Sequence, residues 1–323
     1  MVDLKGTVSG GDRSEERQIM IAKEGIQANF EKMGAAVIFE DSRERSHLNW
    51  RRTHRRSRIV SSVDGRLQLV NSQGNENRRY HAPVIDMRRV GGNETFVVDV
   101  FDDPRAAVKV LDIRPKERHL LLMVTDGETG EKAKYLMGHD ERHWFAAAVP
   151  ESAHAKGVAD AMDALKPTRI LTKQAKAGVK AKDRNRRKND AYVRQGEWFF
   201  ISAPLFEQGT CVIHKDEPIQ RGRGKPHICH ELIRKGGSLV WIHSKWAPNG
   251  VSETQANAIR KRNGVRGRDN LADWTQRVAD AAVYVRGYVK HPDHKTIHLK
   301  VWHRVLPNTE NKARATGFLR FLD

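Results

Sequence analysis

The segment from Lys166 to Arg194 constrains the fold of this chain more than any other part of the sequence. It holds 11 basic residues and two acidic ones, and between Leu171 and Tyr192 it has almost no large apolar side chain. A stretch of that composition has little with which to bury a face of its own. It therefore predicts a basic linker, residues 166–195, between regions that do form cores.

The clustering of charge also indicates a partner. The 323 residues include 58 Lys and Arg against 40 Asp and Glu, a formal net charge of +18. Clustered basic residues create a local positive potential that attracts polyanions. We therefore expect nucleic acid, DNA or RNA, contacted at its phosphates with limited base specificity. The expected contact residues lie in four runs: Arg51, Arg52, Arg55 and Arg56; Arg184, Arg186, Arg187 and Lys188; Arg221, Arg223 and Lys225; and Arg260, Lys261 and Arg262.

Regions on both sides of the basic segment show the period of β-strands. Short runs of Val, Ile, Leu and aromatic residues are separated by Gly, Asp and Pro, which is typical of antiparallel strands joined by turns. The runs that flank Asp64-Gly65 predict a β-hairpin, and a second hairpin is expected over 282–305. We therefore predict an α+β fold with two mainly antiparallel β-rich domains and a few helices.

Periodicity and composition divide the chain into four expected parts. These are an N-terminal helix (14–33) and arginine-rich arm in 1–57, a β-rich domain in 58–165, the linker in 166–195, and a C-terminal α+β domain in 196–323. Further helices are expected at 158–165 and 269–279, where apolar residues recur every three or four positions.

Apolar runs and cysteines limit the class of protein. The longest apolar runs are far shorter than the roughly 20 residues of a spanning helix, and the N-terminus has no apolar signal-peptide core. The two cysteines cannot form a disulfide framework. We therefore expect a cytoplasmic protein without a transmembrane segment, and no pattern in the sequence requires a cofactor.

Three segments carry a resemblance to known sequences: GHDERHWFAAAVP (138–150), RGRGKPH (221–227) and HPDHKTIHLKVWHRVLPNTE (291–310). They resemble segments of a family of uncharacterised bacterial proteins. The resemblance indicates one coherent protein from residue 138 onward and brings no activity with it.

The second expected hairpin contains a group of candidate metal ligands, His291, Asp293, His294 and His298. Imidazole and carboxylate groups can hold a divalent ion, Zn or Mg/Mn, that activates water for phosphodiester cleavage. The alternative is ordinary turn chemistry at Pro292-Asp293, with histidines that contact backbone or phosphate. The sequence HDERH adds His139 and Asp140 as further catalytic candidates, although its flanks favour strands around a solvated turn.

Cysteine and histidine spacing offers a separate zinc alternative. Cys211 and His214, with His227 and Cys229, have the residue types of a tetrahedral zinc site. The spacing is looser than that of paired CxxC motifs, so a buried Cys211 and an unrelated Cys229 remain the competing interpretation.

Glycines and aromatics complete the candidate interface. In RGRGKPH, Gly222 and Gly224 would let backbone amides approach a phosphate, although the segment lacks the P-loop pattern. Four aromatic residues near basic runs are candidates for base stacking, although core packing is the commoner role of each, namely Trp50, Tyr192, Trp246 and Trp302. The leading hypothesis is therefore a nucleic-acid-binding protein. The alternatives are a metal-dependent nuclease that uses the histidine hairpin and a structural component of a nucleoprotein particle.

Overall fold

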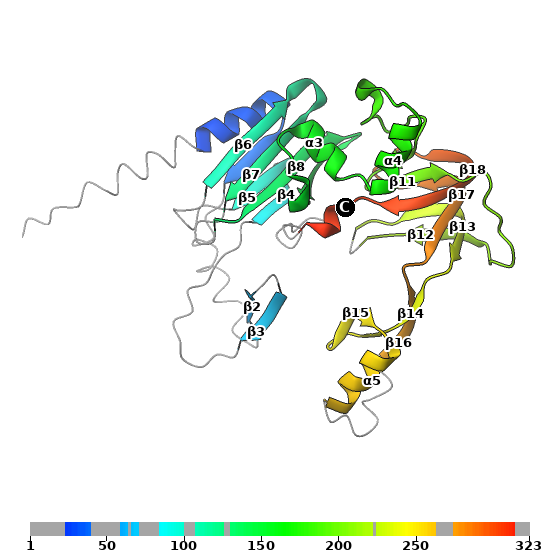
Figure 1. Cartoon of the computed structure of the whole chain (residues 1–323). Coiled ribbons are helices and arrows are strands. Elements are labelled where there is room, and N and C mark those ends of the chain that lie inside the picture. Colours follow the sequence, from blue (N-terminus) through cyan, green and yellow to red (C-terminus); the bar gives the residue numbers. More distant parts are fainter. Residues whose placement is uncertain are drawn as a thin grey trace, which may run out of the picture. The chain divides into compact units, whose positions relative to one another are not determined.

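The computed structural model describes residues 23–39, 59–63, 66–70, 84–99, 107–125, 130–221, 224–262 and 274–313 (Figure 1). Within these residues the fold is α+β, as predicted, with several antiparallel sheets and few helices. No helix in this part of the chain is long and apolar enough to cross a membrane.

The chain forms two compact units whose segments alternate along the sequence. The first unit comprises residues 1–186, 221–224 and 308–323, and the second comprises 187–220 and 225–307. The division falls inside the basic segment, and the C-terminal residues return to the first unit.

Two sheets and a helix over residues 23–33 build the core of the first unit. The three-stranded sheet has the order β1-β5-β4, and the four-stranded sheet has the order β6-β7-β8-β9. Phe30 from the helix, Phe96 from β5 and Trp144 from β9 lie in one buried cluster, with ring centroids 5.3 and 5.6 Å apart. The strands are β1 (Ala36–Phe39), β4 (Val84–Val90), β5 (Asn93–Asp99), β6 (Ala107–Arg114), β7 (His119–Thr125), β8 (Lys132–Asp140) and β9 (His143–Val149).

The first part of the basic segment is folded, which differs from the expectation of a segment without a buried face. Helix α3 (Val158–Ala164) packs on β6, β7 and β8 (Figure 1), and α4 (Thr168–Lys176) follows it. Ile170 and Val179 are buried, and Gln174 Nε2 donates to the Arg184 carbonyl at 2.6 Å. The segment therefore has buried side chains and internal hydrogen bonds of its own.

An antiparallel six-stranded sheet is the main element of the second unit, with the order β10-β11-β18-β17-β13-β12. Its core contains Phe200, Leu232, Val285 and Leu299, all buried. The strands are β10 (Val193–Gln195), β11 (Trp198–Ser202), β12 (His214–Ile219), β13 (His227–Lys235), β17 (Ala282–Lys290) and β18 (Ile297–Pro307). β17 and β18 form the hairpin that the sequence predicts over 282–305.

The residues that lie between β13 and β17 in the sequence form a smaller sheet, which differs from one expectation. It has the order β15-β14-β16, with β14 (Ser238–His243), β15 (Ala247–Val251) and β16 (Trp274–Ala279). Residues 274–279 were expected to be helical, but each of them pairs with a residue of β14, from Ser238↔Ala279 to His243↔Trp274. The helix of this region is α5 (Glu253–Arg262), in which only the basic run Arg260, Lys261 and Arg262 at its end stands out in the sequence.

Local patterns place most other elements correctly. The helix that ends at residue 33 is followed by Gly34 with φ of 79°, a stop that glycine tolerates well. Strands β2 (Ile59–Val63) and β3 (Arg66–Val70) pair as the hairpin expected around Asp64-Gly65. Residues 14–22 of the expected first helix and the arginine-rich arm lie outside the described residues.

Candidate functional site

Three histidines meet at one end of the six-stranded sheet, and we name them the histidine cluster: His227, His291 and His294. His227 begins β13, and the other two lie in the loop between β17 and β18. β13 and β17 are neighbouring strands in which Ile228 lies opposite Lys290. His227, which precedes Ile228, therefore lies beside His291, which follows Lys290. Strand pairing therefore brings together residues that are far apart in the sequence.

The geometry of the histidine cluster is compact. The candidate ligand atoms of the three side chains all lie within 4.8 Å of one another. The rings are stacked, with centroid distances of 4.1 Å between His227 and His291 and 4.6 Å between His291 and His294. Among the described residues, this is the group of histidine, cysteine and carboxylate side chains that converges in this way.

Burial makes His227 unusual. Its side chain is 1% exposed, and neither ring nitrogen has a hydrogen-bond partner within the described residues. Burial, reinforced by His291 and His294, lowers the pKa of His227 to about 3. The pKa of His291 is also lowered, by burial and then by His294. The imidazole of His227 is therefore neutral at physiological pH.

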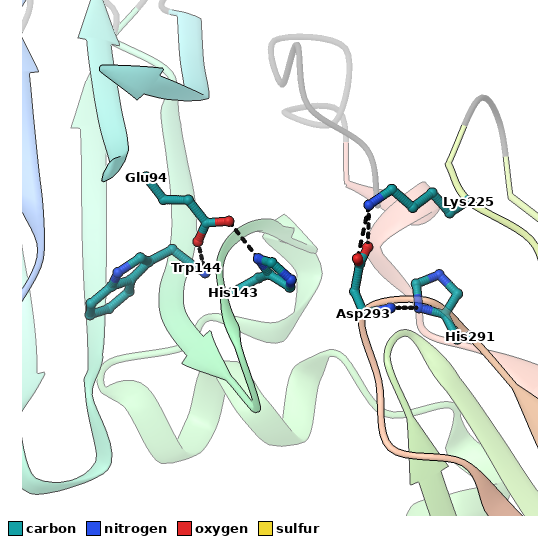
Figure 2. Close-up of polar contacts among 6 residues, drawn as sticks. All are labelled: Glu94, His143, Trp144, Lys225, His291 and Asp293. Atoms are coloured by element: carbon teal, nitrogen blue, oxygen red, sulfur yellow. Dashed lines mark hydrogen bonds and ion pairs between the residues drawn. The ribbon is translucent and has the colours of Figure 1, made fainter. Parts of the chain in front are cut away.

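Neighbouring residues hold the loop of the cluster in place. Gln195, at the end of β10, donates through Nε2 to the backbone oxygens of Lys295 (2.8 Å) and Val289 (3.3 Å). The backbone N–H of Asp293 donates to His291 Nδ1 at 3.2 Å, and Lys225 Nζ bonds both carboxylate oxygens of Asp293 at 2.6 and 2.9 Å (Figure 2).

The third histidine of the predicted hairpin group points elsewhere. His298 is exposed on β18 and stacks on Tyr288 of β17, with ring centroids 4.5 Å apart. Asp293 is bound to Lys225, and its carboxylate is not part of the converging group. Of the residues predicted there, the structure thus brings together His291 and His294 and adds His227.

The four residues of the zinc alternative do not form a converging group in the described part of the chain. His214 and His227 belong to neighbouring strands, but His214 pairs with Leu232 while His227 pairs with Ile219, at opposite ends of β12. Cys229 is fully buried, and burial raises the pKa of its thiol to about 12. Its Sγ contacts the His227 backbone oxygen at 3.8 Å. Cys229 is therefore a protonated core residue.

The HDERH segment is a β-hairpin turn in the first unit, as its flanks suggested. Asp140 pairs with His143 across the turn, where Glu141 has φ of 51°. His143 Nδ1 contacts Glu94 Oε1 at 2.5 Å, and the Trp144 backbone N–H donates to Glu94 Oε2 at 2.9 Å (Figure 2). His139 packs edge-on against Trp144. These contacts tie the turn to β5.

Several predicted phosphate-contacting residues have partners within the protein. Arg221 Nη1 lies 3.2 Å from Glu310 Oε2 and 2.5 Å from Asn308 Oδ1, and Lys225 pairs with Asp293. The Arg260 guanidinium stacks over Trp241 and Trp274 at 4.9 and 4.8 Å. Lys261 and Arg262 are exposed on α5. The candidates outside the described residues are Arg51, Arg52, Arg55, Arg56 and Arg223.

The basic segment presents most of its charge to solvent. Asp183 is the acidic residue within 169–186, and it pairs with Arg186 at 3.0 Å. Arg187, the next candidate along the chain, is half-buried, and Lys188 is exposed. The exposed basic residues of the first unit in this segment are Arg169, Lys176, Lys180, Lys182, Arg184 and Arg186.

A cavity of about 440 Å³ is a second basic feature of the first unit. Its walls include Lys132, Lys134, Lys156 and His154, with Glu151 as the acidic residue and an apolar part formed by Leu111, Met123, Val149 and Pro150. Lys134 Nζ donates to the Ala155 backbone oxygen at 2.6 Å, which holds the segment before α3 against β8.

Sequence reasoning missed how His227, Gly196 and Gln195 contribute to the cluster. The sequence pattern places His227 in the separate zinc alternative, and it does not distinguish Gly196 or Gln195 from other turn and strand residues. Gly196 lies in the turn between β10 and β11 with φ of 55°. A Cβ atom there would lie 2.8 Å from His294 Nε2 and 3.2 Å from His227 Nε2. The available signal was the sequence Gln-Gly before an aromatic strand, which indicates a turn without naming what lies beside it.

No protein-family model, no curated protein and no solved structure matches this chain.

Proposed function

We propose that this protein binds nucleic acid through phosphate contacts with limited base specificity. The observation that carries the proposal is the exposed positive surface of residues 169–186, where six exposed Lys and Arg side chains accompany one acidic residue. Because α4 and the hydrogen bonds of the following loop hold this surface, binding would not have to order the segment first.

Charge over the whole chain supports the same partner. The net charge of +18 favours association with a polyanion, and the lysine-lined cavity adds positive potential to the first unit. Lys and Arg contacts to phosphate position a nucleic acid without reading its bases, which is why limited specificity is expected.

An exposed aromatic pair in the second unit favours unpaired bases. Tyr288 is 50% exposed and stacks on the exposed His298, and the exposed Lys290 and Lys300 lie two residues from them in the same strands. Base stacking on aromatic side chains contributes about 1–3 kcal/mol per base and tolerates any sequence. Single-stranded nucleic acid is therefore expected to bind at least as well as duplex.

Fluorescence anisotropy with labelled single-stranded and duplex DNA and RNA, at several salt concentrations between 50 and 200 mM, tests the proposal. With about six phosphates neutralised, log K should fall with log[salt] at a slope near −5 for duplex DNA. Replacing Lys176, Lys180 and Lys182 by Ala should reduce the magnitude of that slope by about 2–3.

The matched control removes the same charge elsewhere in the first unit, by Lys109→Ala, Lys116→Ala and Lys312→Ala, all at exposed positions. The control triple variant should keep a slope close to the wild type. Equal losses in both triple variants would show that only net charge matters, and absence of binding to all four nucleic acids would refute the proposal.

A further inference from the structure

We propose that His227, His291 and His294 form an open binding site for one divalent transition-metal ion of the zinc type. Three nitrogen donors from neighbouring structural elements converge there. Neutral imidazole is a preferred ligand of zinc, and three protein ligands leave a fourth position for water or a substrate oxygen. The proposed ion thus lies in the second unit, whereas residues 169–186 belong to the first.

The spacing of the rings suits such an ion. Zinc–nitrogen distances of about 2.0–2.1 Å place tetrahedral ligand atoms roughly 3.4 Å apart. The candidate ligand atoms lie within 4.8 Å of one another. Side-chain rotations that move each nitrogen by about an ångström would therefore close the site, and the strands need not move.

His227 provides the second argument. A buried imidazole with no hydrogen-bond partner among the described residues is exceptional, because buried polar groups in folded proteins nearly always find one. The two imidazoles stacked against it, His291 and His294, do not replace the missing hydrogen bonds. A bound cation would satisfy one nitrogen of each ring at once.

Gly196 provides the third argument, because the turn beside the cluster has no side chain. A Cβ atom at this position would enter the space next to the Nε2 atoms of both His294 and His227. Gln195 fixes the same turn to the histidine loop through its bond to the Lys295 backbone oxygen. The glycine therefore lets the turn lie close to both Nε2 atoms, and Gln195 holds the loop that carries His291 and His294.

His291 determines how the ion can be coordinated. Its Nδ1 accepts the Asp293 backbone N–H at 3.2 Å, so the neutral ring carries its proton on Nε2 (Figure 2). Coordination through either nitrogen would replace this hydrogen bond, because coordination through Nε2 moves the ring proton to Nδ1. Asp293 is bound by Lys225, which leaves the fourth position to a ligand from solvent, reached past the half-buried His291 and His294.

The chemistry that an open site supplies is activation of its bound water. With nucleic acid as substrate, which rests on the proposed function, the reaction is phosphodiester hydrolysis. The water oxygen attacks phosphorus, one phosphorus–oxygen ester bond breaks, and the proton released by the water ends on the departing sugar oxygen.

Isothermal titration calorimetry tests the site without any nucleic acid. The full-length protein, freed of metal by chelation, should bind one equivalent of Zn²⁺, and Co²⁺ should give the visible absorption spectrum of a tetrahedral nitrogen-ligated ion. His294→Ala, at a half-buried loop position, should weaken Zn²⁺ binding about a hundredfold or more, and so should His227→Asn. His214→Ala, an exposed histidine at the end of β12 opposite to the His227 pairing, is the matched control and should bind Zn²⁺ as the wild type does.

Circular dichroism checks that each variant is folded, so that His294→Ala still tests the site if His227→Asn does not fold. Failure of the folded wild type to bind Zn²⁺ or Co²⁺ would overturn the inference, as would unchanged affinity in the His294→Ala variant.

Cleavage of labelled single strands, followed on denaturing gels with Zn²⁺ or Mn²⁺ added, tests the hydrolytic step. Cleavage that His294→Ala abolishes while nucleic-acid affinity stays unchanged supports it. Bound metal and bound but intact strands would overturn this step. Metal binding without any nucleic-acid binding would overturn the proposed function and leave the metal site standing.

Discussion

The backbone conformation at Gly196 and the histidine rings beside it both favour glycine at this position. Its φ of 55° is a conformation that side chains disfavour, and the two histidine rings lie where a side chain would go. Gly209 has nearly the same φ, 57°, and a Cβ atom there would meet nothing within 4 Å. Comparing a substitution at Gly196 with the same substitution at Gly209 therefore distinguishes the effect of backbone strain from the effect of crowding the histidine cluster.

Substituting each of these glycines by Ala tests that separation. Both variants should lose about 1–2 kcal/mol of unfolding free energy through backbone strain. Gly196→Ala should also weaken Zn²⁺ binding by about tenfold or more, because the added methyl group displaces the rings, as loss of a supporting contact does at other metal sites. Chemical denaturation and calorimetry measure the two effects, and equal Zn²⁺ affinities would contradict the expected packing of Gly196 on the cluster.

At the scale of elements, α5 and the sheet β15-β14-β16 depend on one arginine. Arg260 was expected to contact phosphate, but its guanidinium lies over Trp241 of β14 and Trp274 of β16. Cation–π contacts of this kind are worth about 0.5–2 kcal/mol. The side chain therefore serves mainly to fix the helix on the sheet, whereas the neighbouring Lys261 is exposed.

Arg260→Ala should accordingly lower the free energy of unfolding by about 1–2 kcal/mol, while Lys261→Ala should change it by less than about 0.5 kcal/mol. Denaturant unfolding followed by circular dichroism measures both. A larger effect of Lys261→Ala on stability would be inconsistent with the role assigned to Arg260.

At the scale of the whole molecule, the first unit is completed by the C-terminal part of the chain. Residues 187–220 and 225–307 separate its main part from residues 308–323. Thr309 Oγ1 donates to the Ala164 backbone oxygen at 2.6 Å, and Glu310 Oε1 accepts the Ala148 backbone N–H at 3.2 Å. Glu310 is 7% exposed, and burial raises its pKa despite the nearby Arg221.

The raised pKa of Glu310 determines the direction in which the stability of the fold changes with pH. Between the ordinary value of 4.5 and the raised value, folded Glu310 holds a proton that the unfolded chain has lost. Stability should therefore fall as pH rises through this window, by at most about 1.4 kcal/mol per pH unit. Glu310→Gln should remove that slope, which thermal or chemical denaturation across pH 4–8 would detect as a difference between the variant and the wild type. Parallel pH profiles of the two proteins would contradict the shift.

Much of the fold follows from local patterns in the sequence. Alternation of apolar residues predicted most of the long strands, including both strands of the β17–β18 hairpin, because each strand has one buried face. The pairing of β14 with β16 could not be predicted in this way. Leu271, Trp274 and Val278 follow a helical period, yet six backbone pairings with β14 outweigh that weak preference.

The candidate site, too, could be predicted from the sequence only in part. By itself, the sequence determined the α+β class, the concentration of positive charge and the nearness of His291 to His294, because these depend on composition and on residues close in the chain. Only the tertiary structure decided that His227 joins them, that His298 points away and that Arg260 is enclosed by tryptophans. The physical reason is that strand pairing and burial depend on residues distant in the sequence, and these set which side chains meet and which lose contact with water.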